Sequence, residues 1–167
     1  MFFLFSLDTL FQIPKPRSII LDEIQAEPPL LPKLATDRAW VRSLAMDITS
    51  DIHPMNNVRV LRYLIKEIGV TNAVKDNWYQ HWIAVGLEGL EKQLCTDARV
   101  GRFATGEQPG LIDICLVTQI FNALGNKMDL NVYPTVMRLF SECMKLPAFI
   151  DASWEKQIDA EGSNPAL

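Results

Sequence analysis

The stretch from Leu111 to Leu124 is apolar at nearly every position, and its apolar positions cover every side of a helical wheel. A helix that is apolar all round is buried all round. This stretch is too short to cross a bilayer, which takes roughly 20 apolar residues. It therefore predicts the central helix of an all-α domain. Gly125 and Asn126 mark its end, because both residue types favour helix C-termini.

The start of this helix is marked as well. Pro109 interrupts what precedes it, and Gly110 can serve as the N-cap. Asp113 then falls at the third helical position, where its carboxylate can accept hydrogen bonds from free N–H groups and face the positive helix end. We interpret Gly110 and Asp113 as structural capping residues. A catalytic role for Asp113 is the alternative, and it is the weaker one because catalytic groups lie in clefts.

Composition limits the classes of function. The chain has 167 residues, which suits one domain, and its net charge of −4 provides no basic field for nucleic acid or an acidic membrane. No stretch qualifies as a transmembrane span. The three cysteines are far apart and odd in number, which argues against a disulfide framework or a zinc site. A reducing, cytoplasmic location fits best.

The chain divides into three parts: residues 1–32, 33–152 and 153–167. The prolines of Glu27 to Pro32 cannot lie inside a helix, so this segment reads as a linker. Met1 to Ile13 is apolar but lacks the features of a signal peptide. It has three possible interpretations: an element packed on the body, a poorly ordered tail, or a start from which upstream sequence has been lost. The last part is a polar tail.

Helical spacing dominates the middle part. One pattern runs from about Thr36 to Ile68 with Pro54 inside it, and a second runs from about Val74 to Leu94. In the second pattern, Trp78, Trp82, Val85 and Leu90 form an apolar stripe that predicts a core face. Two more helices are expected after Pro134 and Leu146. The prediction is an all-α bundle of about five helices.

Pro54 creates the most site-like feature of the chain. A proline inside a helix kinks or breaks it and frees a carbonyl one turn earlier. Beside it stand His53, Asn56, Asn57 and Arg59, which we call the notch. Two interpretations are open: a binding site, or a structural bend whose polar groups face water.

Other chemistry is scarce. The chain has no phosphate-binding loop, dinucleotide fingerprint, zinc-protease motif or nucleophile elbow. Asp47 and Asp51 are one helical turn apart and could hold a metal or share a proton, but exposed carboxylates rarely do so. His81 has no obvious partner, so a surface role is favoured over catalysis. We predict no metal site and no complete catalytic group.

Several segments resemble one family. They keep the order and approximate spacing of the zeta class of glutathione S-transferases, which includes maleylacetoacetate isomerases. The segments are Leu21–Pro32, Asp51–Leu64, Trp78–Ile83, Gly106–Ala123 and Tyr133–Thr135. The run His53-Pro-Met-Asn-Asn57 is the most specific, because it resembles the class signature in this helix.

The resemblance implies a fold and a function. It implies the C-terminal helical domain of a zeta-class enzyme. Such enzymes are homodimers that use glutathione as a cofactor to isomerise maleylacetoacetate in phenylalanine and tyrosine catabolism. It also implies that His53, Asn57, Val58 and Arg59 approach glutathione.

Departures from the family qualify this expectation. Family members carry a thioredoxin-like N-terminal domain of roughly 80 residues with a Ser-Ser-Cys catalytic motif, and nothing here before Leu21 matches it. The family's glutathione-gripping Gln-Ser falls on Ile13 and Pro14, and its substrate-binding arginine falls on Gly125. One hypothesis is an isomerase whose N-terminal half is missing from this chain, inactive alone. The alternative is a non-catalytic helical module for binding or dimerisation.

Overall fold

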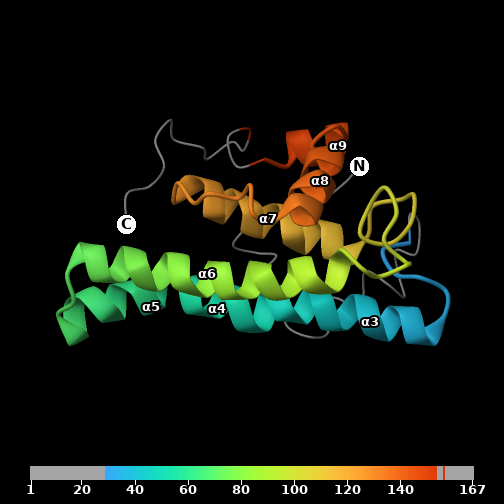
Figure 1. The fold of residues 1–167 in the computed structure, drawn as a ribbon. Coiled ribbons are helices and arrows are strands. Elements are labelled where there is room, and N and C mark those ends of the chain that lie inside the picture. Colours follow the sequence, from blue (N-terminus) through green and yellow to red (C-terminus); the bar gives the residue numbers. More distant parts are fainter. Residues whose placement is uncertain (1–28, 154–155, 157–167) are drawn as a thin grey trace.

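The computed structural model describes residues 29–153 and Lys156 (Figure 1). Counting the segments from Ala35 to Ile68 as one interrupted helix, these residues form five helices and no strand, which confirms the all-α prediction. The interpretations of Met1–Ile13, and of the tail beyond Ser153 except Lys156, concern residues outside the described part. The elements are α3 (Ala35–Met46), η1 (Asp47–Ile52), α4 (His53–Asn56), α5 (Val58–Tyr63), η2 (Leu64–Ile68), α6 (Asn72–Leu94), α7 (Leu111–Gly125), α8 (Pro134–Cys143) and α9 (Pro147–Asp151).

The interrupted helix from α3 to η2 and the long helix α6 lie side by side as a hairpin, and α7 lies along the hairpin with α8 and α9 against one end (Figure 1). The hairpin turns at Gly69, whose φ of +78° is the left-handed conformation that glycine adopts without strain. The N–H of Val70 then donates to the carbonyl of Leu64 and closes the helix end. None of the described helices is both long and apolar enough to span a membrane.

Helix α7 forms the centre of the core. Ile112, Leu116, Ile120 and Ala123 have no exposed surface. The prediction that the helix is buried on every side is too strong, since Leu124 is 44 % exposed. The helix starts where the sequence places it: the Asp113 carboxylate accepts from the N–H of Gly110 (2.8 Å) through one oxygen and from that of Ala104 (2.9 Å) through the other.

Glycine at position 110 also lets the linker pass close to α7. The N–H of Leu111 donates to the carbonyl of Leu30 (3.0 Å). A Cβ atom on residue 110 would lie only 3.0 Å from that same carbonyl oxygen. The linker is therefore held across the start of the central helix.

Helix α6 buries a different stripe from the one predicted. Its buried residues are Tyr79, Ile83, Leu87, Leu90 and Leu94. Trp78 and Trp82 are only half-buried at the edge of this stripe, and Val85 is 50 % exposed. The prediction is confirmed for Leu90 and wrong for Val85, because α6 carries apolar residues on two faces and only the tertiary packing selects between them.

Two contacts fix α6 against its neighbours. Gly86 faces η1 so closely that a Cβ there would lie 2.2 Å from Cγ1 of Ile52. Near the C-terminal end of α6, the Glu91 carboxylate accepts from the N–H groups of Thr135 (3.0 Å) and Val136 (2.9 Å). Glu91 thereby satisfies the first turn of α8, which begins at Pro134 as predicted.

The close approach at Gly86 generates a paired prediction. Gly86→Ala should lower the free energy of unfolding by about 1–3 kcal/mol, because the buried Ile52 side chain must move. Gly89→Ala, three residues along the same helix with nothing within 4 Å of its Cβ position, should instead raise it by up to about 1 kcal/mol, since alanine favours helix. Urea denaturation of both variants measures the difference. Equal effects would contradict the tight α6–η1 packing.

Candidate functional site

The candidate site is the notch, where the long first helix is interrupted. The sequence predicted that Pro54 kinks or breaks the helix, and in the structure the helix continues through Pro54. The preceding segment η1 widens into a π-helix, in which the N–H of His53 donates to the carbonyl of Ile48, five residues earlier. The wider turn accommodates the proline ring, which would otherwise clash with the carbonyl four residues back. Such π-helical insertions are frequent at functional sites.

The break comes at Asn57. Its backbone is extended, with φ −62° and ψ 138°, and its side-chain oxygen accepts from the N–H of Arg59 (3.0 Å). Asn57 therefore ends α4 and caps α5. From α6, the indole N–H of Trp78 donates to the carbonyl of Met55 (2.9 Å), which occupies one of the acceptors left free at the end of α4. The notch is thus held in place from a second helix.

The structure brings the predicted ligand residues together around this break. His53 and Asn57 are half-buried, whereas Val58 and Arg59 are exposed. They present an imidazole, an amide, an apolar side chain and a guanidinium within two short helical segments. Such a set can bind an anionic, amide-containing ligand, because the guanidinium pairs with carboxylates and the amide offers both a donor and an acceptor.

Asn56 is the notch residue for which the sequence predicted no role. It is 5 % exposed, and neither polar atom of its side chain has a hydrogen-bond partner in the part of the chain that the structure describes. Residue type and spacing place Asn56 in the notch, but only the packing reveals that its amide is buried.

Trp78 and Trp82 line α6 one turn apart. Their rings meet edge to face with centroids 5.7 Å apart, and His81 meets Trp82 in the same way at 5.1 Å. The Trp82 indole nitrogen is buried without a partner among the described residues. His81 itself is exposed.

The thiols near the core are not poised for nucleophilic chemistry. Burial raises the pKa of the Cys115 thiol to about 12, and the nearby charge of Asp113 adds to the rise. Burial and the same carboxylate also raise the pKa of Cys143. Both thiols stay protonated at neutral pH, and a protonated thiol is a poor nucleophile. Burial raises the pKa of Asp113 too, although the Gly110 and Ala104 N–H groups oppose this shift.

The paired carboxylates of η1, Asp47 and Asp51, belong to no larger cluster of metal-ligating residues in the described part of the chain. The side-chain amide of Gln93 donates to Asp47 (3.2 Å), and no group of three His, Cys, Asp or Glu residues in the described part could hold a metal ion.

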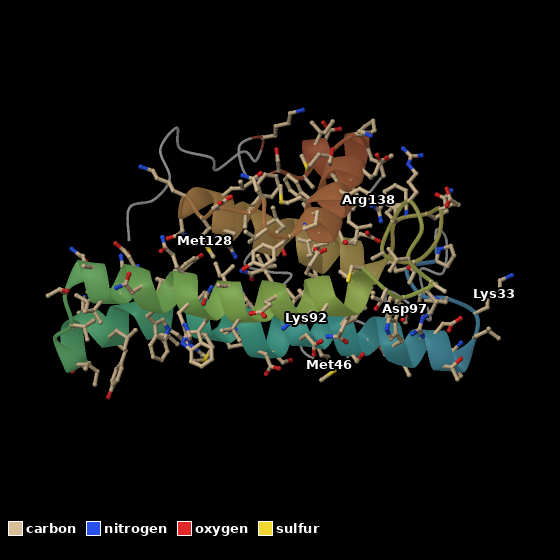
Figure 2. The ribbon with its side chains drawn as sticks, viewed as in Figure 1. Lys33, Met46, Lys92, Asp97, Met128 and Arg138 are labelled. Atoms are coloured by element: carbon tan, nitrogen blue, oxygen red, sulfur yellow. The ribbon has the colours of Figure 1, made fainter. Side chains whose placement is uncertain are left out.

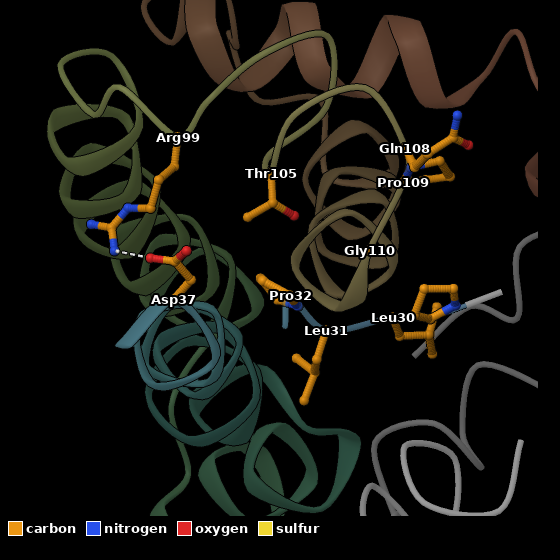
Figure 3. A pocket seen from close by; sticks show the side chains of 10 residues that line it. Leu30, Leu31, Pro32, Asp37, Arg99, Thr105, Gln108, Pro109 and Gly110 are labelled. Carbon is orange, nitrogen blue, oxygen red and sulfur yellow. Dashed lines mark ion pairs between the residues drawn. The ribbon is translucent and has the colours of Figure 1, made fainter. Parts of the chain in front are cut away.

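A separate cavity of about 260 Å³ lies between the linker and the start of α7 (Figure 3). Its charged wall is Arg99, which pairs with Asp97 (2.6 Å) and Asp37 (3.6 Å) and lies 4.1 Å from the Trp40 ring centre. The guanidinium holds the pKa of Asp97 down at about 2. Since Arg99 is already neutralised by two carboxylates, this cavity offers a ligand little charge, and the notch is the stronger candidate. Its other lining residues are Pro29, Leu30, Leu31, Pro32, Thr105, Gln108, Pro109 and Gly110.

Comparisons with known proteins identify the family of the chain. The chain is 42 % identical over 140 residues to a probable maleylacetoacetate isomerase of Vibrio cholerae, a match that covers 84 % of this chain and 64 % of the relative. Its structure superposes on a holo maleylpyruvate isomerase, described as a bacterial glutathione S-transferase of the zeta class, with TM-score 0.85 and 37 % identity over 89 % of this chain and 71 % of that one. The chain belongs to the zeta class of glutathione transferases.

A third relative shows a ligand for this class. Maleylacetoacetate isomerase from Anaeromyxobacter dehalogenans, solved with glutathione in its active site, matches with TM-score 0.78 and 38 % identity over 84 % of this chain and 63 % of that one. No protein-family model matches the chain. The chain spans just under two thirds of the length of the Vibrio zeta-class relative.

The two tryptophans supply a test of how the notch is held. Trp78→Phe should lower the free energy of unfolding by the loss in packing from the smaller ring and by a further amount of about 1 kcal/mol, because the Met55 carbonyl loses its hydrogen-bond donor. Trp82→Phe removes an indole N–H that has no partner among the described residues, so it should cost less. Thermal unfolding of both variants measures the difference. A larger loss in Trp82→Phe would contradict the assigned role of Trp78.

Proposed function

We propose that this chain provides the helical part of a glutathione-dependent cis–trans isomerase that acts on a maleyl-type acid such as maleylacetoacetate. Two observations support the proposal. Several relatives that match most of the chain are named maleylacetoacetate or maleylpyruvate isomerase. The residues that the resemblance assigns to glutathione lie on either side of the α4–α5 junction.

Each residue that the resemblance assigns to glutathione then has a task. Arg59 is exposed and carries the positive charge that a glutathione carboxylate requires. The Asn57 side chain caps the start of α5 by accepting from the N–H of Arg59, and this bond fixes the position of the Arg59 backbone. His53 lies on the α4 side of the break and Val58 on the α5 side, so the ligand is gripped from both. When bound, glutathione supplies the thiol for the isomerisation, and these residues bind and orient it.

We propose further that this chain alone binds glutathione without isomerising a substrate. The sequence contains no Ser-Ser pair to activate the glutathione thiol, and the thiols of Cys115 and Cys143 have raised pKa values. Gly125 stands exposed at the end of α7, at the position where the family places its substrate-binding arginine. A cytoplasmic location is part of the same proposal, supported by three free cysteines.

Calorimetric titration of the chain with glutathione tests the site. We expect micromolar binding that weakens at least tenfold, or about 1.4 kcal/mol, in His53→Ala and Arg59→Ala. Arg62→Ala is the matched control, because Arg62 is exposed on the same helix and outside the notch. Absence of binding by the unaltered chain would overturn the proposal. An equal loss of glutathione affinity in Arg62→Ala would mean that Arg59 acts only through general charge attraction and not as a specific contact.

We also propose that the chain forms a homodimer through the outer face of the α3–α6 hairpin. Most of the exposed large apolar side chains that the structure describes belong to this hairpin, and those outside the glutathione-binding residues are Met46, Tyr63, Ile68, Val74 and Val85. Figure 2 shows Met46 projecting from the hairpin on the side away from α7. Gathered apolar side chains on a folded surface mark an interaction face.

Sedimentation velocity tests the dimer. Met46→Glu should shift the chain from dimer to monomer, because a charge would be buried in the interface. Val132→Glu is the control, since Val132 is 64 % exposed but lies between α7 and α8, away from the hairpin face. A monomeric unaltered chain, or dissociation by Val132→Glu alone, would contradict this interface.

A further inference from the structure

Asn56 is a residue of the α4–α5 junction whose whole side-chain amide is buried without a hydrogen-bond partner in the described structure. Its Oδ1 and Nδ2 atoms are both buried without a partner among the described residues. Its neighbours are occupied: the Asn57 side chain accepts from Arg59, and the Met55 carbonyl accepts from Trp78. Asn56 therefore differs from its two sequence neighbours in that both polar atoms of its side chain lack a partner among the described residues.

An unpaired buried amide is unfavourable, because it has lost its bonds to water and gained none from the protein. Native structures contain few such groups, and a functional site is one of the places where they persist. An asparagine side chain carries a donor and an acceptor at once, so a peptide group, with its own N–H and C=O, can satisfy both.

Asn56 stands directly beside residues that the resemblance assigns to glutathione. Asn56 is the last residue of α4 and directly precedes the extended residue Asn57. The short segment from α4 to α5 is bounded by π-helical turns on both sides, η1 and η2.

We propose that Asn56 is a binding residue for the peptide backbone of glutathione, exchanging its buried, unpaired state for two hydrogen bonds to one peptide group of the tripeptide. The charged ends of the ligand are left to residues such as Arg59. This inference rests on the proposed function, because it needs glutathione in the notch. It goes beyond the resemblance, which assigns His53, Asn57, Val58 and Arg59 only.

The chain contains a matched control. Gln119 on α7 has no exposed surface, and both its polar side-chain atoms also lack a partner among the described residues. It lies outside the notch, on the central helix. Asn56→Leu and Gln119→Leu each replace an unpaired amide by an apolar side chain, so both variants should melt about 2–4 °C higher than the unaltered chain.

Glutathione binding separates the two variants. In calorimetry on the full chain, Asn56→Leu should weaken binding about tenfold, whereas Gln119→Leu should leave it unchanged. The side-chain amide signals of Asn56 in nitrogen-edited NMR spectra, identified by their loss in Asn56→Leu, should shift on adding glutathione, and those of Gln119 should not.

The outcomes distinguish this inference from the function on which it rests. Absence of binding by the unaltered chain overturns both. Binding that is unchanged in Asn56→Leu, or Asn56 amide signals that stay in place in the glutathione-saturated chain, overturns the inference and leaves the glutathione site standing. If Asn56→Leu does not fold, the NMR shift in the unaltered chain decides by itself.

Discussion

The buried carboxylate of Asp113 joins three parts of the domain that are distant along the chain. It accepts from Gly110 at the start of α7 and from Ala104 in the preceding loop, and the Cys143 thiol at the end of α8 donates to it across 3.8 Å. A carboxylate in a core is unfavourable unless its oxygens are paired, so these donors must all be in place at once. The orientation of α7 relative to the loop and to α8 depends on this one group, and the core is built around α7.

The notch depends on a second constraint, which is how a helix accommodates a proline. The π-helical turn of η1 absorbs Pro54, the helix continues for one turn, and it stops at Asn57. Trp78 of α6 then takes up the carbonyl of Met55. Hydrogen bonds from both helices of the hairpin hold these turns in place, so the polar residues of the notch lie on a rigid scaffold. A well-supported scaffold is what a binding site requires.

Local patterns predicted the fold class and much of the candidate site. The apolar run of α7, with Gly110 and Asp113 at its start, contains its own boundaries, because capping depends on residues within one turn of each other. The notch residues could be named for the same reason, since His53 to Arg59 are neighbours in sequence. The family resemblance then supplied a ligand that composition and spacing alone could not.

The remaining features depend on partners far along the chain. Met55 and Trp78 are 23 residues apart, and Glu91 caps a helix that begins more than 40 residues later. The Trp78, Trp82 and Val85 stripe looked like a core face, yet α6 buries the stripe of Ile83 and Leu87 instead.

By itself, the sequence determined that this protein is helical, where its central helix begins and ends, and which residues surround Pro54. Only the tertiary structure decided that the helix widens rather than breaks at Pro54, that Asn56 is buried without a partner in the described part, and which face of α6 enters the core. The physical reason is the distance along the chain over which each interaction acts. Helix propensity and capping act within a turn, whereas burial and long-range hydrogen bonds exist only after distant helices have packed together.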